Sequence, residues 1–82
     1  RRMSTLDLAK QALAKIKRNP ALAHVADDID LIDDIGLDSL ETLQFLLELE
    51  DVLGARIDYD RLEFQMLRSL RTLASFLDGA PC

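Results

Sequence analysis

The chain has 82 residues, of which 49% are hydrophobic, 5% are aromatic and 30% are charged, and its formal net charge is −5. A chain of this length makes one domain, residues 1–82, and its many Leu and Ala residues favour a small helical bundle over a sheet. The negative charge argues against nucleic acid as a partner. No apolar run approaches the length of a membrane span and nothing resembles a signal peptide, so we expect a cytoplasmic protein. We also expect a monomer.

The first predicted helix spans about residues 5–18. Ser4 is placed to cap it, and apolar residues from Leu6 to Ile16 recur at helical spacing. Asn19 ends it, because the residue before Pro20 is biased away from the helical region. A long loop, about residues 19–38, follows, and its scattered apolar residues predict that it packs across the bundle.

The second predicted helix spans about residues 39–53 and opens with the pattern of a capping box. Asp38 has the side chain of a helix N-cap, and Glu41 lies three positions later, where its carboxylate reaches the backbone N–H of the cap. Ser39 is then the first helical residue, beside free N–H groups and the positive end of the helix dipole. That environment favours an anion, so Ser39 is a candidate site for a phosphate ester.

Polar residues of the second helix are predicted to lie on one narrow stripe. The stripe consists of Glu41, Gln44, Glu48 and Asp51. Leucines cover most of the remaining circumference, and we expect the core to absorb Leu43, Leu46, Leu47 and Leu53. Leu40, next to Ser39, is expected to contact a partner instead. Gly54 ends the helix.

Two shorter helices are predicted after Gly54. Asp60 and Glu63 repeat the capping pattern and predict a third helix over about residues 60–66. Ser69 is placed to cap a fourth over about residues 70–78, and Gly79 follows it as a stop signal. The predicted fold is therefore all-α, a small four-helix bundle with a long loop between the first two helices and a short third helix.

Acidic residues gather around Ser39. Residues 27–51 contain ten acids and no Lys or Arg, whereas residues 1–26 contain six bases and a single acid, Asp7. A solvated acidic face is the simpler interpretation of such a block. Because this one is centred on Ser39, we favour a surface that attracts basic regions of partner proteins.

Gly36-Leu37-Asp38-Ser39-Leu40, followed by Glu41-Thr42-Leu43, resembles the Gly-x-Asp-Ser-Leu signature of acyl carrier proteins. The resemblance covers nearly the whole chain, since its length and helix order also match. It implies a stand-alone carrier with 4′-phosphopantetheine attached covalently to Ser39. Such a protein shuttles thioester-bound acyl groups between enzymes and is their substrate rather than a catalyst.

The resemblance also implies the partners and the surface that they bind. The partners are a phosphopantetheinyl transferase, an acyltransferase or acyl ligase, and ketosynthase-type enzymes, each binding through a basic patch. The matching positions are Asp38, Leu40, Glu41, Glu48, Glu50 and Asp51, together with Gln44, where fatty-acid carriers commonly have an acid. Gln44, with Arg61, Arg68 and Arg71 further along, favours polyketide or other specialised biosynthesis over a housekeeping fatty-acid role.

Two other interpretations stay open. A peptidyl, aminoacyl or D-alanyl carrier shares the fold and the arm, but Ile35-Gly36-Leu37 lacks the Gly-Gly often found in peptidyl carriers. A helical docking module would use Asp38 and Ser39 only as a helix cap. Whether the bundle also encloses an acyl chain is equally open.

Catalytic residues and a metal site are not expected. His24, the only histidine, lies in the predicted loop with no sign of a catalytic triad around it. Asp28 and Asp30 begin like a calcium-binding loop, but Ile32 stands where the third oxygen ligand belongs. A nucleophilic serine needs a base to remove its proton, and the sequence shows no sign of one for Ser39. Ser39 is therefore interpreted as a site of modification.

Overall fold

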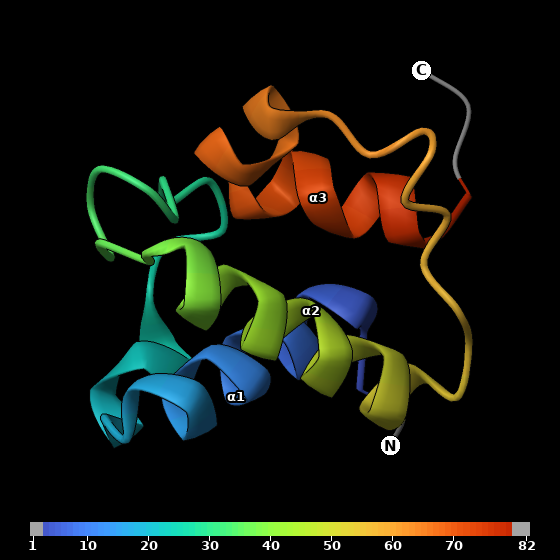
Figure 1. Ribbon diagram of the computed structural model, residues 1–82. Helices are drawn as coiled ribbons and strands as arrows, with labels where there is room; N and C mark the ends of the chain where they lie inside the picture. Colours follow the sequence, from blue (N-terminus) through green and yellow to red (C-terminus); the bar gives the residue numbers. More distant parts are fainter. Residues whose placement is uncertain (1–2, 80–82) are drawn as a thin grey trace.

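The structure is a computed structural model that describes residues 3–79 (Figure 1). In chain order its elements are α1 (Thr5–Lys17), the 3₁₀-helix η1 (Pro20–His24), α2 (Ser39–Leu53), the 3₁₀-helix η2 (Phe64–Arg68) and α3 (Leu70–Leu77). Within residues 3–79 there is no strand, so the predicted all-α class is confirmed. Over these residues the bundle has three α-helices rather than four, because the predicted third helix is a short 3₁₀-helix.

Local hydrogen bonds cap the starts of α1 and η1, and Arg18 ends α1. The Ser4 hydroxyl accepts from the backbone N–H of Asp7 at 3.1 Å and so caps the start of α1. Arg18 ends the helix in a left-handed conformation, with φ 54°. The side chain of Asn19 then accepts from the backbone N–H of Ala21 at 3.1 Å and caps η1. The first helix thus stops one residue early, and a helical turn interrupts the predicted loop.

The third helix predicted over residues 60–66 is wrong in position and in type. The Asp58 carboxylate accepts from the backbone N–H of Asp60 at 3.2 Å, and the Asp58 carbonyl accepts from that of Arg61 at 3.1 Å. These bonds form a turn where the helix was expected to begin, because an aspartate side chain competes for backbone donors. The helical turn forms only from Phe64 onward, as η2.

The core lies where α1 packs against α2 and α3, and η2 packs against α3. Its most deeply buried side chains are Leu13, Leu31, Phe45, Leu49, Leu70 and Leu73. Leu31 and Leu37 come from the loop before α2, so this loop packs across the bundle as its apolar residues predicted. No helix within residues 3–79 combines the length and the apolar character needed to cross a lipid bilayer.

Leu43 and Leu47 do not join this core. They are 49% and 51% exposed, so the expectation that the bundle absorbs them is wrong. Leu46 is buried and Leu53 is half-buried, as expected. Among the helices, α1 packs against α2, and the face of α2 that bears Leu43 and Leu47 is left uncovered.

The contrast between neighbouring leucines predicts different costs of truncation. Leu49→Ala removes a fully buried side chain of α2 and should lower the free energy of unfolding by about 2–5 kcal/mol, whereas the exposed Leu47→Ala should change it by less than about 0.5 kcal/mol. Urea unfolding followed by circular dichroism measures both variants. Equal losses for the two would contradict the assigned face of α2.

Candidate functional site

Ser39 is the first residue of α2, and its side chain is exposed. The predicted capping box before it is present: the Asp38 carboxylate accepts from the backbone N–H of Glu41 at 2.7 Å, and the Glu41 carboxylate accepts from that of Asp38 at 3.2 Å. The Thr42 hydroxyl donates to the Asp38 carbonyl at 2.7 Å. These bonds determine where α2 begins, and they keep Ser39 in its first turn.

Backbone hydrogen bonds and the conformation of Gly36 fix the loop that leads to Ser39. Gly36 has φ 80°, a conformation that other residues rarely adopt, and it turns the chain into the buried Leu37. The N–H of Leu37 donates to the Leu31 carbonyl at 3.0 Å, and the N–H of Leu31 donates to the Leu67 carbonyl at 3.0 Å. Backbone hydrogen bonds thus connect η2, through Leu31, to the residue two positions before Ser39.

Arg68 also holds this loop in place, through two ion pairs. Its guanidinium contacts the carboxylates of Asp30 and Asp33, each at 2.5 Å. Burial raises the pKa of Asp30, but hydrogen bonds from the Asp33 backbone and from Arg68 outweigh that effect and leave the pKa below its ordinary 3.8. Hydrogen bonding and the charge of the two carboxylates raise the pKa of Arg68.

Asp27 makes a second connection between the loop and the helices. Its carboxylate contacts Lys10 of α1 at 2.5 Å and Arg71 of α3 at 3.8 Å. The hydrogen bond from Lys10 lowers the pKa of Asp27 in spite of some desolvation. Part of the acidic block is therefore neutralised within the domain by bases from α1, η2 and α3.

The carboxylates predicted to bind partners differ in how free they are. Asp38 and Asp51 are exposed, as are Leu40, which is 64% exposed, and Gln44. Glu41 and Glu48 are half-buried and face α1.

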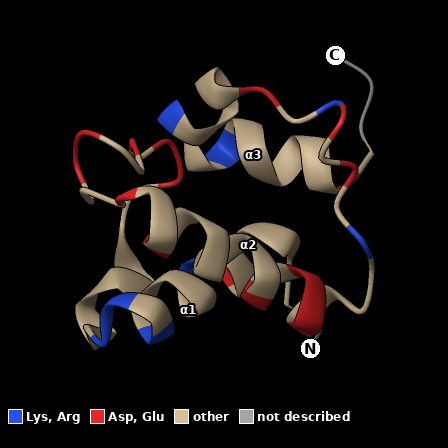
Figure 2. Cartoon of the chain, in the orientation of Figure 1, with Lys and Arg blue, Asp and Glu red and all other residues tan. Residues whose placement is uncertain are grey.

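Two lysines of α1 pair with those half-buried acids. Lys17 contacts the Glu41 carboxylate at 3.0 Å, and Lys15 contacts that of Glu48 at 3.1 Å. Figure 2 shows the bases of α1 beneath α2 and the acids along the loop. The predicted acidic stripe of α2 is therefore divided, with two of its acids engaged by α1.

Glu50 has a structural role. Its carboxylate accepts from the backbone N–H of Ile57 at 2.7 Å and so holds the segment that follows α2. Burial and the negative charge of Glu50 raise the pKa of the Tyr59 phenol. Because neighbouring residues of a helix point in different directions, the Glu50 carboxylate lies on a different side of α2 from Asp51.

Residue-by-residue reading of the sequence missed the lysine pairs and the clamp made by Arg68. Neither has a local signal, because each joins residues more than 20 positions apart in the chain. The exposed face of α2 did have a local signal in the sequence. Leu40, Leu43 and Leu47 are spaced i, i+3 and i+7, so they share one side of the helix.

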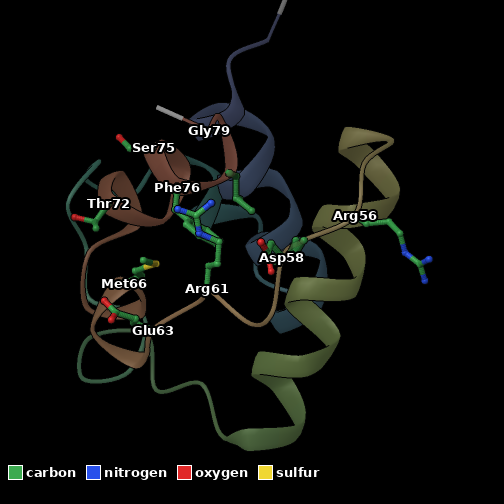
Figure 3. A pocket seen from close by; sticks show the side chains of 11 residues that line it. Arg56, Asp58, Arg61, Glu63, Met66, Thr72, Ser75, Phe76 and Gly79 are labelled. Atoms are coloured by element: carbon green, nitrogen blue, oxygen red, sulfur yellow. The ribbon is translucent and has the colours of Figure 1, made fainter. Parts of the chain in front are cut away.

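A pocket of about 610 Å³ lies between α3 and the segment after α2 (Figure 3). Charged side chains, including Asp58, Arg61 and Glu63, line it together with the apolar Met66 and Phe76. None of its lining residues belongs to α2 or to the loop before α2, so the pocket is formed independently of Ser39.

His24 and the loop aspartates show no arrangement for catalysis or metal binding in the described part of the chain. His24 is exposed at the end of η1, and no hydrogen bond joins it to Ser39 within residues 3–79. Over the same residues, no three His, Cys, Asp or Glu side chains are grouped to hold a metal ion. Asp30, considered above as a calcium ligand, is instead engaged by Arg68.

Comparison with known proteins identifies the family. The family model for the phosphopantetheine attachment site matches residues 8–77. The chain belongs to the acyl carrier protein family. It is 32% identical over 62 residues to an acyl carrier protein of Saccharopolyspora erythraea, an alignment that covers 76% of this chain and 64% of that protein. The chain thus spans less than two thirds of the length of this relative.

The cofactor of this family is 4′-phosphopantetheine, attached covalently. Its phosphate needs an accessible hydroxyl and a setting that tolerates negative charge. The exposed Ser39 at the N-terminal end of a 15-residue helix meets both requirements, because the first N–H groups and the dipole of a helix favour an anion. The residues present therefore fit the group.

The hydrogen bonds of the capping box predict a specific cost of removing the cap. Asp38→Ala should lower the free energy of unfolding by about 1 kcal/mol, whereas Asp38→Asn, which keeps a side-chain acceptor, should retain most of the stability. Urea denaturation of the two variants measures the difference. If Asn were as costly as Ala, a hydrogen-bonding cap would be the wrong description of Asp38.

The lowered pKa of Asp30 predicts a pH-dependent role for Arg68. A carboxyl whose pKa is lower in the folded state stabilises the fold above its unfolded pKa, and this contribution is lost as the pH falls through the folded pKa. The loss of stability caused by Arg68→Gln should therefore be larger near neutral pH and shrink below about pH 4.

Urea titrations between about pH 2.5 and 7 test this, with Arg61→Gln as the matched control because Arg61 has no ion pair among residues 3–79. A loss that stays constant over this range would contradict the assigned pairing of Arg68 with Asp30.

Proposed function

We propose that Ser39 carries the 4′-phosphopantetheine arm and that the protein presents acyl thioesters on this arm to a series of enzymes. The observation that carries the proposal is the position of Ser39, exposed in the first turn of α2 and next to the cap at Asp38. A phosphopantetheinyl transferase would join the Ser39 oxygen to the phosphate of coenzyme A that bears the pantetheine. The bond from this phosphate to the rest of the nucleotide breaks, adenosine 3′,5′-bisphosphate leaves, and the hydroxyl proton is released. The terminal thiol of the bound group supplies the thioester chemistry.

The surroundings of Ser39 support a carrier that other enzymes act upon. The capping box and the backbone bonds of the loop hold the serine in one position, so a partner need not order this segment when it binds. The side of α2 next to Ser39 is exposed from Leu40 to Asp51 and gives partners a surface within reach of the arm.

The proposed partners are the transferase, an acyltransferase or acyl ligase, and condensing enzymes of the ketosynthase type. Gln44 is exposed in the middle of the accessible face of α2, where the resemblance places an acid in fatty-acid carriers. This supports a role in polyketide or other specialised biosynthesis. The named relative from Saccharopolyspora erythraea is an acyl carrier protein, which supports an acyl rather than an aminoacyl load.

Incubation with a phosphopantetheinyl transferase and coenzyme A tests the proposal by intact-mass spectrometry. The wild-type chain should gain the mass of one phosphopantetheine, Ser39→Ala should gain none, and the control Ser75→Ala, which removes an exposed serine of α3, should be labelled like wild type. A label retained by Ser39→Ala, or no label on the wild-type chain, would overturn the assignment.

A further inference from the structure

The carboxylate of Glu41 is bound at both of its oxygens. Oε1 accepts from the backbone N–H of Asp38 at 3.2 Å and completes the capping box, while Oε2 contacts the Lys17 ammonium of α1 at 3.0 Å. A glutamate side chain on a helix surface has many rotamers, and ordering it costs conformational entropy. Because Lys17 holds the second oxygen, the first is already directed at the cap.

The ion pair between Lys17 and Glu41 is partly shielded from solvent. The two side chains are 26% and 27% exposed. Partly buried charges are screened less than exposed ones, so this pair holds its side chains more strongly than one on the open surface. Lys17 is also the last residue of α1, where Arg18 ends the helix. Its ammonium group is therefore anchored on one helix while it holds a side chain of the other.

A second ion pair joins the same two helices but does not reach the cap. The Lys15 ammonium contacts the two carboxylate oxygens of Glu48 at 3.2 and 3.1 Å. Glu48 lies nine residues after Ser39, about 14 Å along the helix axis at a rise of 1.5 Å per residue. Lys15 therefore connects α1 to α2 without contacting the segment that holds Ser39, and it provides a matched comparison for Lys17.

From these contacts we infer that Lys17 is a positioning residue for the transfer of phosphopantetheine to Ser39. By holding Glu41 against the cap at Asp38, it keeps this first turn of α2 in the conformation that presents the Ser39 hydroxyl. The inference rests on the proposed function and adds a residue of α1 that neither bears the arm nor belongs to α2. A serine held in one position loses less entropy when it meets the phosphate of coenzyme A, so the effect falls on the rate of transfer.

Positioning by Lys17 and an effect of its charge on docking predict different kinetics. Without the Lys17 charge, Glu41 has no ion-pair partner among residues 3–79, so a basic transferase surface would bind more tightly and KM would fall. If Lys17 instead positions the cap, Ser39 is in place in a smaller fraction of the bound chains. The rate at which bound chains react then falls, so kcat decreases while KM changes little.

Lys17→Met tests the inference, because methionine keeps an apolar stem and removes the charge. For transfer from coenzyme A to the full chain by a phosphopantetheinyl transferase, kcat should fall about two- to fivefold, the range that one such ion pair supplies, with KM within about twofold of wild type. Lys17→Arg keeps the charge and should restore most of the rate. Lys15→Met is the matched control and should keep kcat within about 1.5-fold of wild type. Circular dichroism verifies that each variant is folded, and Lys17→Gln repeats the test if Lys17→Met is not.

Exchange of single backbone amides with solvent, measured by NMR, observes the cap directly. The Asp38 N–H donates to the Glu41 carboxylate, so its exchange should quicken about two- to fivefold in Lys17→Met and stay unchanged in Lys15→Met. The Leu37 N–H donates to a backbone carbonyl instead and should keep its wild-type exchange rate in both variants. A general loosening of the domain would quicken both amides, so this comparison separates a local role from a structural one.

The inference and the proposed function fail in different ways. A kcat of Lys17→Met equal to that of wild type would overturn the inference and leave the proposed function intact. A change in KM alone would do the same, since it indicates an effect of charge on docking. An equal fall in kcat for Lys15→Met would also overturn it, since it indicates a general effect of helix packing. A wild-type chain that takes no label would overturn the proposed function, and this inference with it.

Discussion

The reciprocal hydrogen bonds between Asp38 and Glu41 are the interaction on which the rest of the site depends. They determine the residue at which α2 begins and therefore keep Ser39 in the first turn of that helix. Glu41 has a further role, because its second carboxylate oxygen pairs with Lys17 of α1. One side chain thus caps α2 and connects it to α1, so the position of Ser39 depends on how the two helices pack.

The acidic composition of the chain gives an incomplete picture of its surface. Many of its carboxylates neutralise bases inside the domain: Asp27 meets Lys10 and Arg71, and Arg68 joins Asp30 to Asp33. These contacts, with the backbone bonds around Leu31, hold a long loop in place. The loop before the exposed Ser39 is therefore already ordered. Less conformational entropy is then lost when a partner binds.

Local features of this protein could be predicted from its sequence, and long-range ones could not. The capping box needs only Asp38 and Glu41 at their spacing, and the helical periodicity gave the all-α fold. The exposure of Leu43 and Leu47 depends on how much of α2 the other helices cover, which no spacing reveals. The third helix was predicted in the wrong place because Asp58 was not part of the capping pattern read from Asp60 and Glu63. Asp58 accepts hydrogen bonds from the backbone N–H groups of Asp60 and Arg61, and these bonds form a turn there instead of a helix.

The most direct test of the central claim is to locate the attached group on the unmodified sequence. The wild-type chain is loaded from coenzyme A by a phosphopantetheinyl transferase, digested, and sequenced by tandem mass spectrometry. The account predicts that the arm is found on Ser39 and on no other residue. A loaded chain whose arm sits on Ser4, Ser69 or Ser75 would contradict it, since none of these serines follows the capping box of α2.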